Sequence, residues 1–125
     1  MRQPVAERGN GAPPAGAVLG QGASPGRATG RVRIVSAPED FDAFQPGEVL
    51  VVQATAPAWT PLFGRAAAVV TDGGTLAAHA SLVAREYGIP AVVGTGQATR
   101  VLATGQLVTV DGTTGTVALV GDRSP

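Results

Sequence analysis

The sequence has no cysteine and only one histidine, His79. Without thiols the chain forms no disulfide and no thiolate metal site, and a lone imidazole needs several carboxylates beside it to build a zinc or iron centre. A metal cofactor held by this chain alone is therefore not expected.

Charge is also scarce, since charged residues make up 14% of the chain and aromatic residues only 4%. Nine basic residues balance nine acidic ones, which gives a formal net charge of zero. The basic residues are scattered singly, with no patch that is interleaved with aromatic side chains. Nucleic acid is therefore not expected as a partner.

Long apolar runs are missing as well. The first residues, MRQPVAERGN, lack the apolar stretch of a secretory signal, and no later run approaches the length needed to span a membrane. We therefore expect a cytoplasmic protein without a membrane partner. Hydrophobic residues still make up 44% of the 125 residues, which is enough apolar surface for one compact core.

The composition divides the chain into three parts. Residues 1–26 are rich in glycine, alanine and proline and are predicted to form a flexible leader or linker, because such a stretch cannot offset its own ordering entropy. An alternative is that residues 18–26 dock on the domain. Residues 27–121 are predicted to form the folded domain, and residues 122–125 a short tail.

Short valine-rich runs bounded by Gly, Pro and Asp predict strands. They are RVRIV at 31–35, EVLVV at 48–52, AAAVVT at 66–71, IPAVVG at 89–94, QLVTVDG at 106–112 and GTVALV at 115–120. The runs AVV and IPAVV have no polar alternation, which favours strands covered on both faces and so an α/β layered domain. We read VDGTTG at 110–115 as a hairpin connection, in which Asp-Gly supplies the positive φ of a tight turn.

Helical periodicity is clearest from about Ala77 to Tyr87, where apolar residues recur on one face and Gly88 ends the pattern. Two shorter helices are predicted, one that starts between residues 59 and 61 and one over 97–103. The first turn of the long helix carries His79 at the margin of the apolar face, so the imidazole ring should be partly exposed.

The run TDGGTLAAH places His79 directly after a glycine-rich turn, where backbone amides and the helix dipole favour an anion. Imidazole is largely neutral at cytoplasmic pH and can act as a nucleophile toward phosphorus. The site could therefore carry a phosphoryl group. The alternative is a tight strand-to-helix connection with Thr75 as N-cap and no ligand, in which His79 only packs beside a helix end.

The segment TDGGTLAAHASLVAREYGIPAVVG resembles the active-site segment of the phosphohistidine swivelling domain, the mobile domain of phosphoenolpyruvate-utilising enzymes such as pyruvate phosphate dikinase, phosphoenolpyruvate synthase and rifampin phosphotransferase. The resemblance extends from about residue 19 to residue 119. It implies a compact β/β/α domain with a central sheet, on which the His79 helix packs. It also implies that His79 is phosphorylated and that the preceding loop binds the phosphoryl oxygens. The implied phosphate-binding residues are Gly73, Gly74, Thr75, Ala77 and Ala78.

Two positions depart from the family's usual pattern. Thr75 replaces a common loop glycine, and Ala78 stands where a small hydroxyl or thiol residue usually precedes the histidine. The hydroxyls of Thr75 and Ser81 are candidates to replace the missing group. These departures keep open an alternative function, a non-catalytic interaction or regulatory module that retains the fold.

The resemblance implies a phosphotransferase component, which accepts a phosphoryl group on His79 and passes it to an acceptor. In this family the donor site and the acceptor site lie on other domains. We therefore expect an ATP-grasp nucleotide-binding domain or subunit and an acceptor-binding domain as partners. Magnesium and either ATP or phosphoenolpyruvate are expected on those partners, with no cofactor bound by this chain alone.

Overall fold

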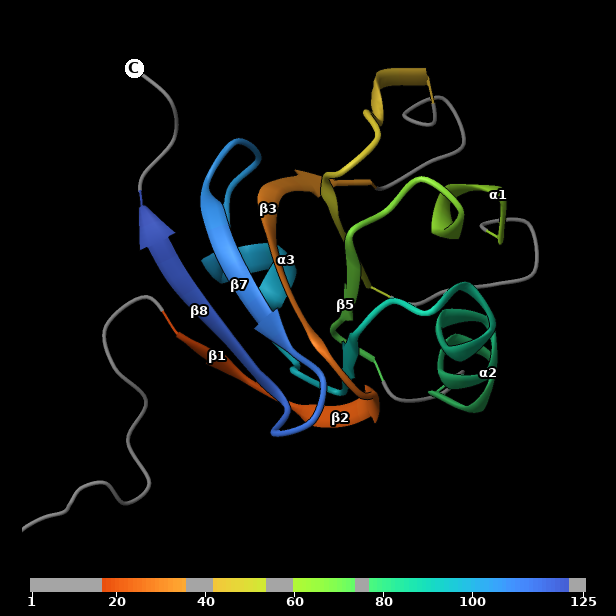
Figure 1. Ribbon diagram of the computed structural model, residues 1–125. Helices are drawn as coiled ribbons and strands as arrows, with labels where there is room; N and C mark the ends of the chain where they lie inside the picture. The colour runs from red at the N-terminus through yellow and green to blue at the C-terminus, as the bar shows by residue number, and fades with distance from the viewer. Residues whose placement is uncertain (1–16, 36–41, 54–59, 74–76, 122–125) are drawn as a thin grey trace, which may run out of the picture.

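The computed structural model describes residues 17–35, 42–53, 60–73 and 77–121 (Figure 1). Within these residues the chain forms one eight-stranded sheet and three helices. The strands are β1 (Val18–Leu19), β2 (Gln21–Ser24), β3 (Arg27–Ile34), β4 (Val49–Val52), β5 (Ala68–Thr71), β6 (Ala91–Val93), β7 (Leu107–Asp111) and β8 (Thr116–Gly121). The helices are α1 (Thr60–Phe63), α2 (Ala77–Tyr87) and α3 (Ala98–Val101).

The sheet is mixed, with the strand order β1-β8-β7-β3-β4-β5-β6-β2. Strands β3, β4, β5 and β6 run parallel to one another, while β7, β8, β1 and β2 are added antiparallel. Every residue of β4, β5 and β6 is buried, which for β5 and β6 was predicted from the lack of polar alternation in AVV and IPAVV. Strand β7 alternates between buried and half-buried residues, which is typical of a strand with one wetter face.

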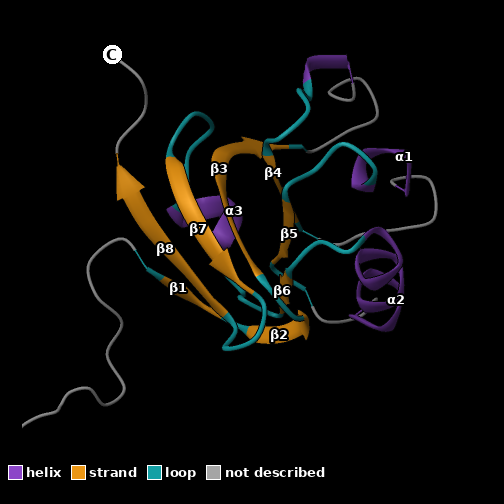
Figure 2. Ribbon diagram, in the orientation of Figure 1, coloured by secondary structure: helices purple, strands orange, loops and turns teal. Residues whose placement is uncertain are grey.

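Two apolar clusters cover the two faces of the parallel strands. Successive residues of β4 alternate between them, since Leu50 and Val52 join the cluster that contains α1 and α2, whereas Val49 and Val51 join the cluster that contains α3. Figure 2 shows α1 and α2 together on one side of β5 and α3 on the other side, behind β3 and β7. The predicted α/β layers are therefore confirmed.

Helix α2 packs on the sheet through Ala80 and Ala84, which are fully buried against β2, β5 and β6. The small side chains at these positions allow the helix backbone to approach the sheet closely. The helix ends where the sequence predicts, because Gly88 has a φ of 70°, a left-handed conformation that favours glycine. Within the described residues, none of the helices has the length and hydropathy needed to cross a bilayer.

The folded part begins earlier than composition alone predicts. Strands β1 and β2 lie inside the predicted leader, at 18–19 and 21–24, so the domain boundary at residue 27 is too late and the docking alternative is correct. Composition missed these strands because each is short and gains its order from pairing at a sheet edge, β1 with β8 and β2 with β6. The predicted leader before residue 17 and the tail at 122–125 lie outside the described residues.

The sheet curls so that its two edges meet, because the edge strands β1 and β2 are separated in sequence by Gly20 alone. The hairpin between β7 and β8 closes the seam: the amide of Gly20 donates to the carbonyl of Gly115 at 2.9 Å, and the amide of Gly112 donates to the carbonyl of Gly26 at 2.8 Å. The curled sheet therefore depends on backbone contacts that only glycines permit.

The hairpin itself was correctly located, but the reason given for it was wrong. Gly112 does not have a positive φ; the left-handed residue is Gly115, with a φ of 81°. The turn is held by the Asp111 carboxylate, which accepts hydrogen bonds from the amides of Thr113 and Thr114 at 3.0 and 3.1 Å. The Thr114 amide, then the Thr113 amide and Arg27, hold the pKa of Asp111 below its usual value.

Candidate functional site

His79 lies in the first turn of α2, and its side chain is half-buried, in agreement with the predicted partial exposure. The imidazole contacts the ring of Phe63, the last residue of α1. The two ring centroids are 6.3 Å apart, and the ring planes meet at 71°, an edge-to-face arrangement. One side of the imidazole therefore rests on a buried aromatic ring.

The same helix end supplies backbone donors. Because α2 begins at Ala77, the amides of Ala77 and Ala78 belong to the first turn, whose N–H groups have no partner within the helix. The helix dipole adds partial positive charge at this end. An anion attached to the His79 ring could therefore be stabilised by these amides. Gly74 and Thr75, predicted to bind the same group, lie outside the described residues.

The amide of Gly73 has a backbone partner in the structure. It donates to the carbonyl of Gln53 at 2.6 Å, and the amide of Asp72 donates to the carbonyl of Val52 at 3.1 Å. The chain thus continues its contact with the end of β4 for two residues beyond β5. The role of Gly73 as a phosphate ligand stays a prediction.

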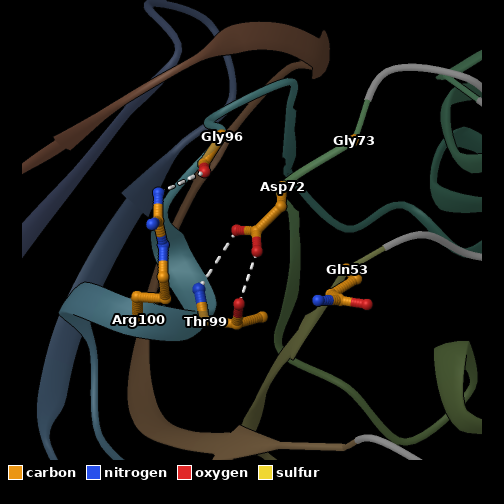
Figure 3. A pocket seen from close by; sticks show the side chains of 6 residues that line it. All are labelled: Gln53, Asp72, Gly73, Gly96, Thr99 and Arg100. Atoms are coloured by element: carbon orange, nitrogen blue, oxygen red, sulfur yellow. Dashed lines mark hydrogen bonds between the residues drawn. The ribbon is translucent and has the colours of Figure 1, made fainter.

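A polar network that the sequence analysis missed fixes the end of β5 (Figure 3). The Asp72 carboxylate accepts hydrogen bonds from the amide of Thr99 at 3.1 Å and from the Thr99 hydroxyl, both drawn in Figure 3. It also accepts a hydrogen bond from the Thr95 hydroxyl at 3.2 Å. The Asp72 carbonyl accepts from the amide of Gly96 at 2.9 Å. Asp72 thereby joins the chain that leads to His79 with the start of α3. An aspartate placed directly after a buried strand was the available signal for it.

An open pocket of about 530 Å³ lies beside this network, where the parallel strands β4 and β5 end. Its lining residues are Gln53, Asp72, Gly73, Gly96, Thr99 and Arg100. The carboxyl ends of parallel strands are the usual place for ligand sites in α/β sheets. The segment that leads to α2 leaves the sheet at this edge, so the pocket borders the approach to the His79 helix.

Two further polar residues of α2 have structural partners. The Ser81 hydroxyl donates to the carbonyl of Ala23 at 2.6 Å, and the Arg85 guanidinium donates to the same oxygen at 3.3 Å. Both bonds tie α2 to β2. The Ser81 hydroxyl is thus directed to the sheet and does not replace the side chain that Ala78 lacks; the same suggestion for Thr75 lies outside the described residues.

The described residues were also considered as possible ligands of a metal ion. Among the residues that the structure describes, no three side chains of His, Cys, Asp or Glu come together in a way that could hold a metal ion.

Comparison with known proteins supports a single family. Residues 44–115 match the family model described as the PEP-utilising enzyme, mobile domain. The chain is 52% identical over 107 residues to a phosphoenolpyruvate synthase of Aeropyrum pernix, which covers 83% of this chain and 13% of that protein. It is 48% identical over 103 residues to an uncharacterized phosphotransferase of Bacillus subtilis, with 82% of this chain and 12% of that protein covered. The chain thus spans only a small part of these relatives.

Solved structures agree with the fold. A solution structure of Enzyme I superposes with a TM-score of 0.57 and 33% identity, and covers 62% of this chain and 32% of that chain. Aconitase X of Thermococcus kodakaraensis superposes with a TM-score of 0.63 and covers 83% of this chain and 98% of that chain. Its identity is only 19%, so it supports the architecture and nothing further.

Proposed function

This chain belongs to the family of the PEP-utilising enzyme mobile domain, and we propose that it is a phosphocarrier in which His79 accepts a phosphoryl group from one partner domain and delivers it to another. The observation that carries the proposal is the place of His79: a half-buried imidazole in the first turn of α2, beside amides that have no partner within the helix.

The chemistry needs only one nucleophilic nitrogen. A neutral ring nitrogen of His79 attacks the phosphorus of the donor in line, a P–N bond forms, and the P–O bond to the leaving group breaks with its electron pair on that oxygen. The other ring nitrogen keeps its proton. In the second step an acceptor oxygen attacks the phosphorus, the P–N bond breaks, its electron pair returns to the ring, and a base on the acceptor side takes the acceptor's proton.

Backbone donors at the helix end stabilise the intermediate. The amides of Ala77 and Ala78 and the dipole of α2 favour the negative charge on the attached phosphoryl oxygens. The loop residues Gly74 and Thr75 complete the binding site in this proposal. The Asp72 network holds the end of β5, from which that loop starts, against the start of α3.

The remaining functions belong to partners. The relatives whose sequences are 48% and 52% identical are much longer than this chain, which spans 12% of the phosphotransferase and 13% of the phosphoenolpyruvate synthase. We propose that an ATP-grasp nucleotide-binding domain or subunit supplies the phosphoryl group and that a further domain binds the acceptor. Magnesium and ATP or phosphoenolpyruvate then bind to those partners, where the metal neutralises charge on the phosphates.

A direct test uses radiolabelled phosphoenolpyruvate or nucleotide together with the donor partner. The proposal predicts a protein-bound label that is lost in acid and retained in base, as a phosphoramidate bond requires. A chain that stays unlabelled with either donor, while its partner turns over, would instead support the non-catalytic module. A label that survives acid would point to an ester on a hydroxyl and would contradict the role of His79.

Restoring the missing hydroxyl should speed the reaction. In the variant Ala78→Ser a side-chain donor returns next to His79, and a hydrogen bond to a charged group contributes about 1.5–3 kcal/mol, or roughly ten- to a hundredfold in rate if it acts in the transition state. We expect faster labelling, measured as the initial rate with saturating donor. The control is Ala103→Ser, which adds the same hydroxyl after α3, outside the His79 helix. Slower labelling of Ala78→Ser would show that alanine is suited to this position.

Docking to the donor should involve Leu82. This residue follows His79 by one helical turn, and its side chain is 66% exposed. A partner that receives the His79 ring therefore covers Leu82 as well, and the loss of a buried leucine contact weakens association by about 1.5–3 kcal/mol. We expect Leu82→Gln to slow partner-dependent labelling at least roughly tenfold.

Two comparisons make this result specific. Labelling by phosphoramidate, a small donor that needs no protein partner, should be unchanged in Leu82→Gln. The control Val101→Gln alters an apolar residue on α3 that is 46% exposed, and it should label as wild type with both donors. Equal rates for Leu82→Gln and wild type with the protein donor would remove Leu82 from the interface.

A further inference from the structure

The ring of Phe63, a residue of α1, contacts the proposed nucleophile His79 of α2. Its ring meets the His79 imidazole edge to face, with centroids 6.3 Å apart and an interplanar angle of 71°. The exposed fraction of Phe63 is 0%, so the ring lies wholly inside the protein and presents one side to the half-buried imidazole.

Phe63 is held firmly in place. It belongs to the apolar cluster under α2, together with Ala80 and Ala84 of that helix. The turn after α1 is closed by hydrogen bonds from the amides of Arg65 and Ala66 to the carbonyl of Leu62, both 3.0 Å. A phenyl ring packed on all sides in this way cannot yield when the imidazole rotates, because protein interiors are close-packed.

Helix α1 packs along α2 beyond this one ring contact. Phe63 touches His79 near the start of α2, and Gly64, directly after α1, lies near Tyr87 at its end, since an added Cβ would be 3.4 Å from Cε1 of Tyr87. The packing of α1 along α2 therefore sets the position of the phenyl ring relative to the imidazole.

Orientation matters for this reaction because a histidine side chain can present either ring nitrogen. In-line transfer requires one nitrogen to lie on the axis of the P–O bond that breaks, and errors of about 1 Å in such placement can cost roughly a hundredfold in rate. A rigid ring against one side of the imidazole limits the rotation about the Cβ–Cγ bond. The same nitrogen is then presented in each encounter.

We propose that Phe63 is a positioning residue for phosphoryl transfer: by its edge-to-face contact it selects the rotamer of His79 and so which ring nitrogen takes the phosphoryl group. This inference rests on the proposed phosphocarrier function. Phe63 does not touch the phosphoryl group and acts only through the imidazole.

The chain offers a matched control in Phe44. This residue is also a buried phenylalanine, 1% exposed, and it belongs to the same apolar cluster as Phe63. Phe63→Leu and Phe44→Leu remove a similar volume from the same core, so both should lower the melting temperature. Of the two, Phe63→Leu is the variant that removes the ring in contact with His79.

The experiment labels the full chain with phosphoramidate and follows both the initial rate and the identity of the phosphorylated nitrogen, by NMR of protein that carries labelled histidine. We expect wild type and Phe44→Leu to form one phosphohistidine isomer at the same rate. Phe63→Leu should label about tenfold more slowly and give a mixture of the two isomers, because the edge-to-face contact that restricts the imidazole is lost. A change of isomer measured on folded protein cannot be explained by a loss of stability.

The outcomes separate the two proposals. If wild type takes no label from phosphoramidate or from a protein donor, the phosphocarrier function fails. If wild type labels on His79 but Phe63→Leu gives the same isomer at the same rate, or if Phe44→Leu changes both measurements equally, the positioning role of Phe63 is wrong. Should Phe63→Leu not fold, Phe63→Met keeps a side chain of closer volume and tests the same contact.

Discussion

Replacing His79 by alanine is expected to abolish protein-bound phosphate. The reaction depends on a ring nitrogen that forms the P–N bond, and no other histidine is present in the chain to take its place. Labelling with the donor partner should fall at least roughly a thousandfold, which corresponds to about 4 kcal/mol in the barrier. The measurement is the initial rate of acid-labile label incorporated into the purified chain.

This result needs evidence that the variant is folded. The His79 side chain is half-buried and contacts Phe63, so alanine leaves some space beside the phenyl ring. His79→Gln fills more of that space, retains a polar tip and has no nucleophilic nitrogen. We expect both variants to keep the circular dichroism spectrum of wild type and to remain unlabelled. Labelling of either variant at the wild-type rate would place the phosphoryl group on another residue.

Replacing Gly112 by alanine is expected to disrupt the seam of the curled sheet. A Cβ at Gly112 would overlap the carbonyl oxygen of Ser24 and would lie 2.9 Å from the amide nitrogen of Ala91. Both neighbours are backbone atoms of paired strands, so they cannot move aside without loss of strand pairing. The free energy of unfolding should fall by about 3 kcal/mol or more, the upper end of overpacking effects.

Gly64→Ala is the control for this prediction. The added Cβ would make an ordinary contact of 3.4 Å with the ring of Tyr87, and Gly64 is exposed. Gly64→Ala should therefore change the melting temperature by only a few degrees, whereas Gly112→Ala should lower it by more than about 12 °C, since each kcal/mol corresponds to roughly 4–8 °C in a domain of this size. Equal melting temperatures for the two variants would mean that the strands at the seam can move apart without loss of stability.

The parts of the fold that the sequence predicts share a simple physical signal. Strands β4, β5 and β6 are short runs of buried apolar residues, and such runs have few other stable environments. Helix α2 has an apolar face and ends at a glycine with positive φ, so both its extent and its end are encoded locally. In β7 the buried Val108 and Val110 alternate with the half-buried Thr109 and Asp111, so the sequence pattern and the burial agree there as well.

The parts that it did not predict depend on contacts between distant residues. Strand β2 contains two exposed residues and is ordered by pairing with β6, about seventy positions later, which no local pattern shows. The hydrogen bonds of Asp72 to Thr95 and Thr99 and the bond of the Gly73 amide to Gln53 are also long-range. A glycine-rich loop predicts accessible amides, but tertiary pairing decides which of them remain free.

Histidine at the start of a helix is common, and what singles out His79 is the combination of several features. Its ring is half-buried, a rigid aromatic side chain from α1 lies on one side, and the amides of a helix N-terminus lie nearby. The fold then joins this helix to the sheet through Ser81 and Arg85, so that the proposed nucleophile moves as one body with the domain.

The most direct measurement is the location of the phosphoryl group on the wild-type chain after a brief reaction with its donor. Digestion and tandem mass spectrometry at neutral to alkaline pH would preserve a phosphoramidate and identify the modified residue. Our account predicts a single modified peptide, with the added phosphoryl group on His79. A phosphoryl group on a serine, threonine or aspartate, with His79 unmodified while the donor is consumed, would contradict it.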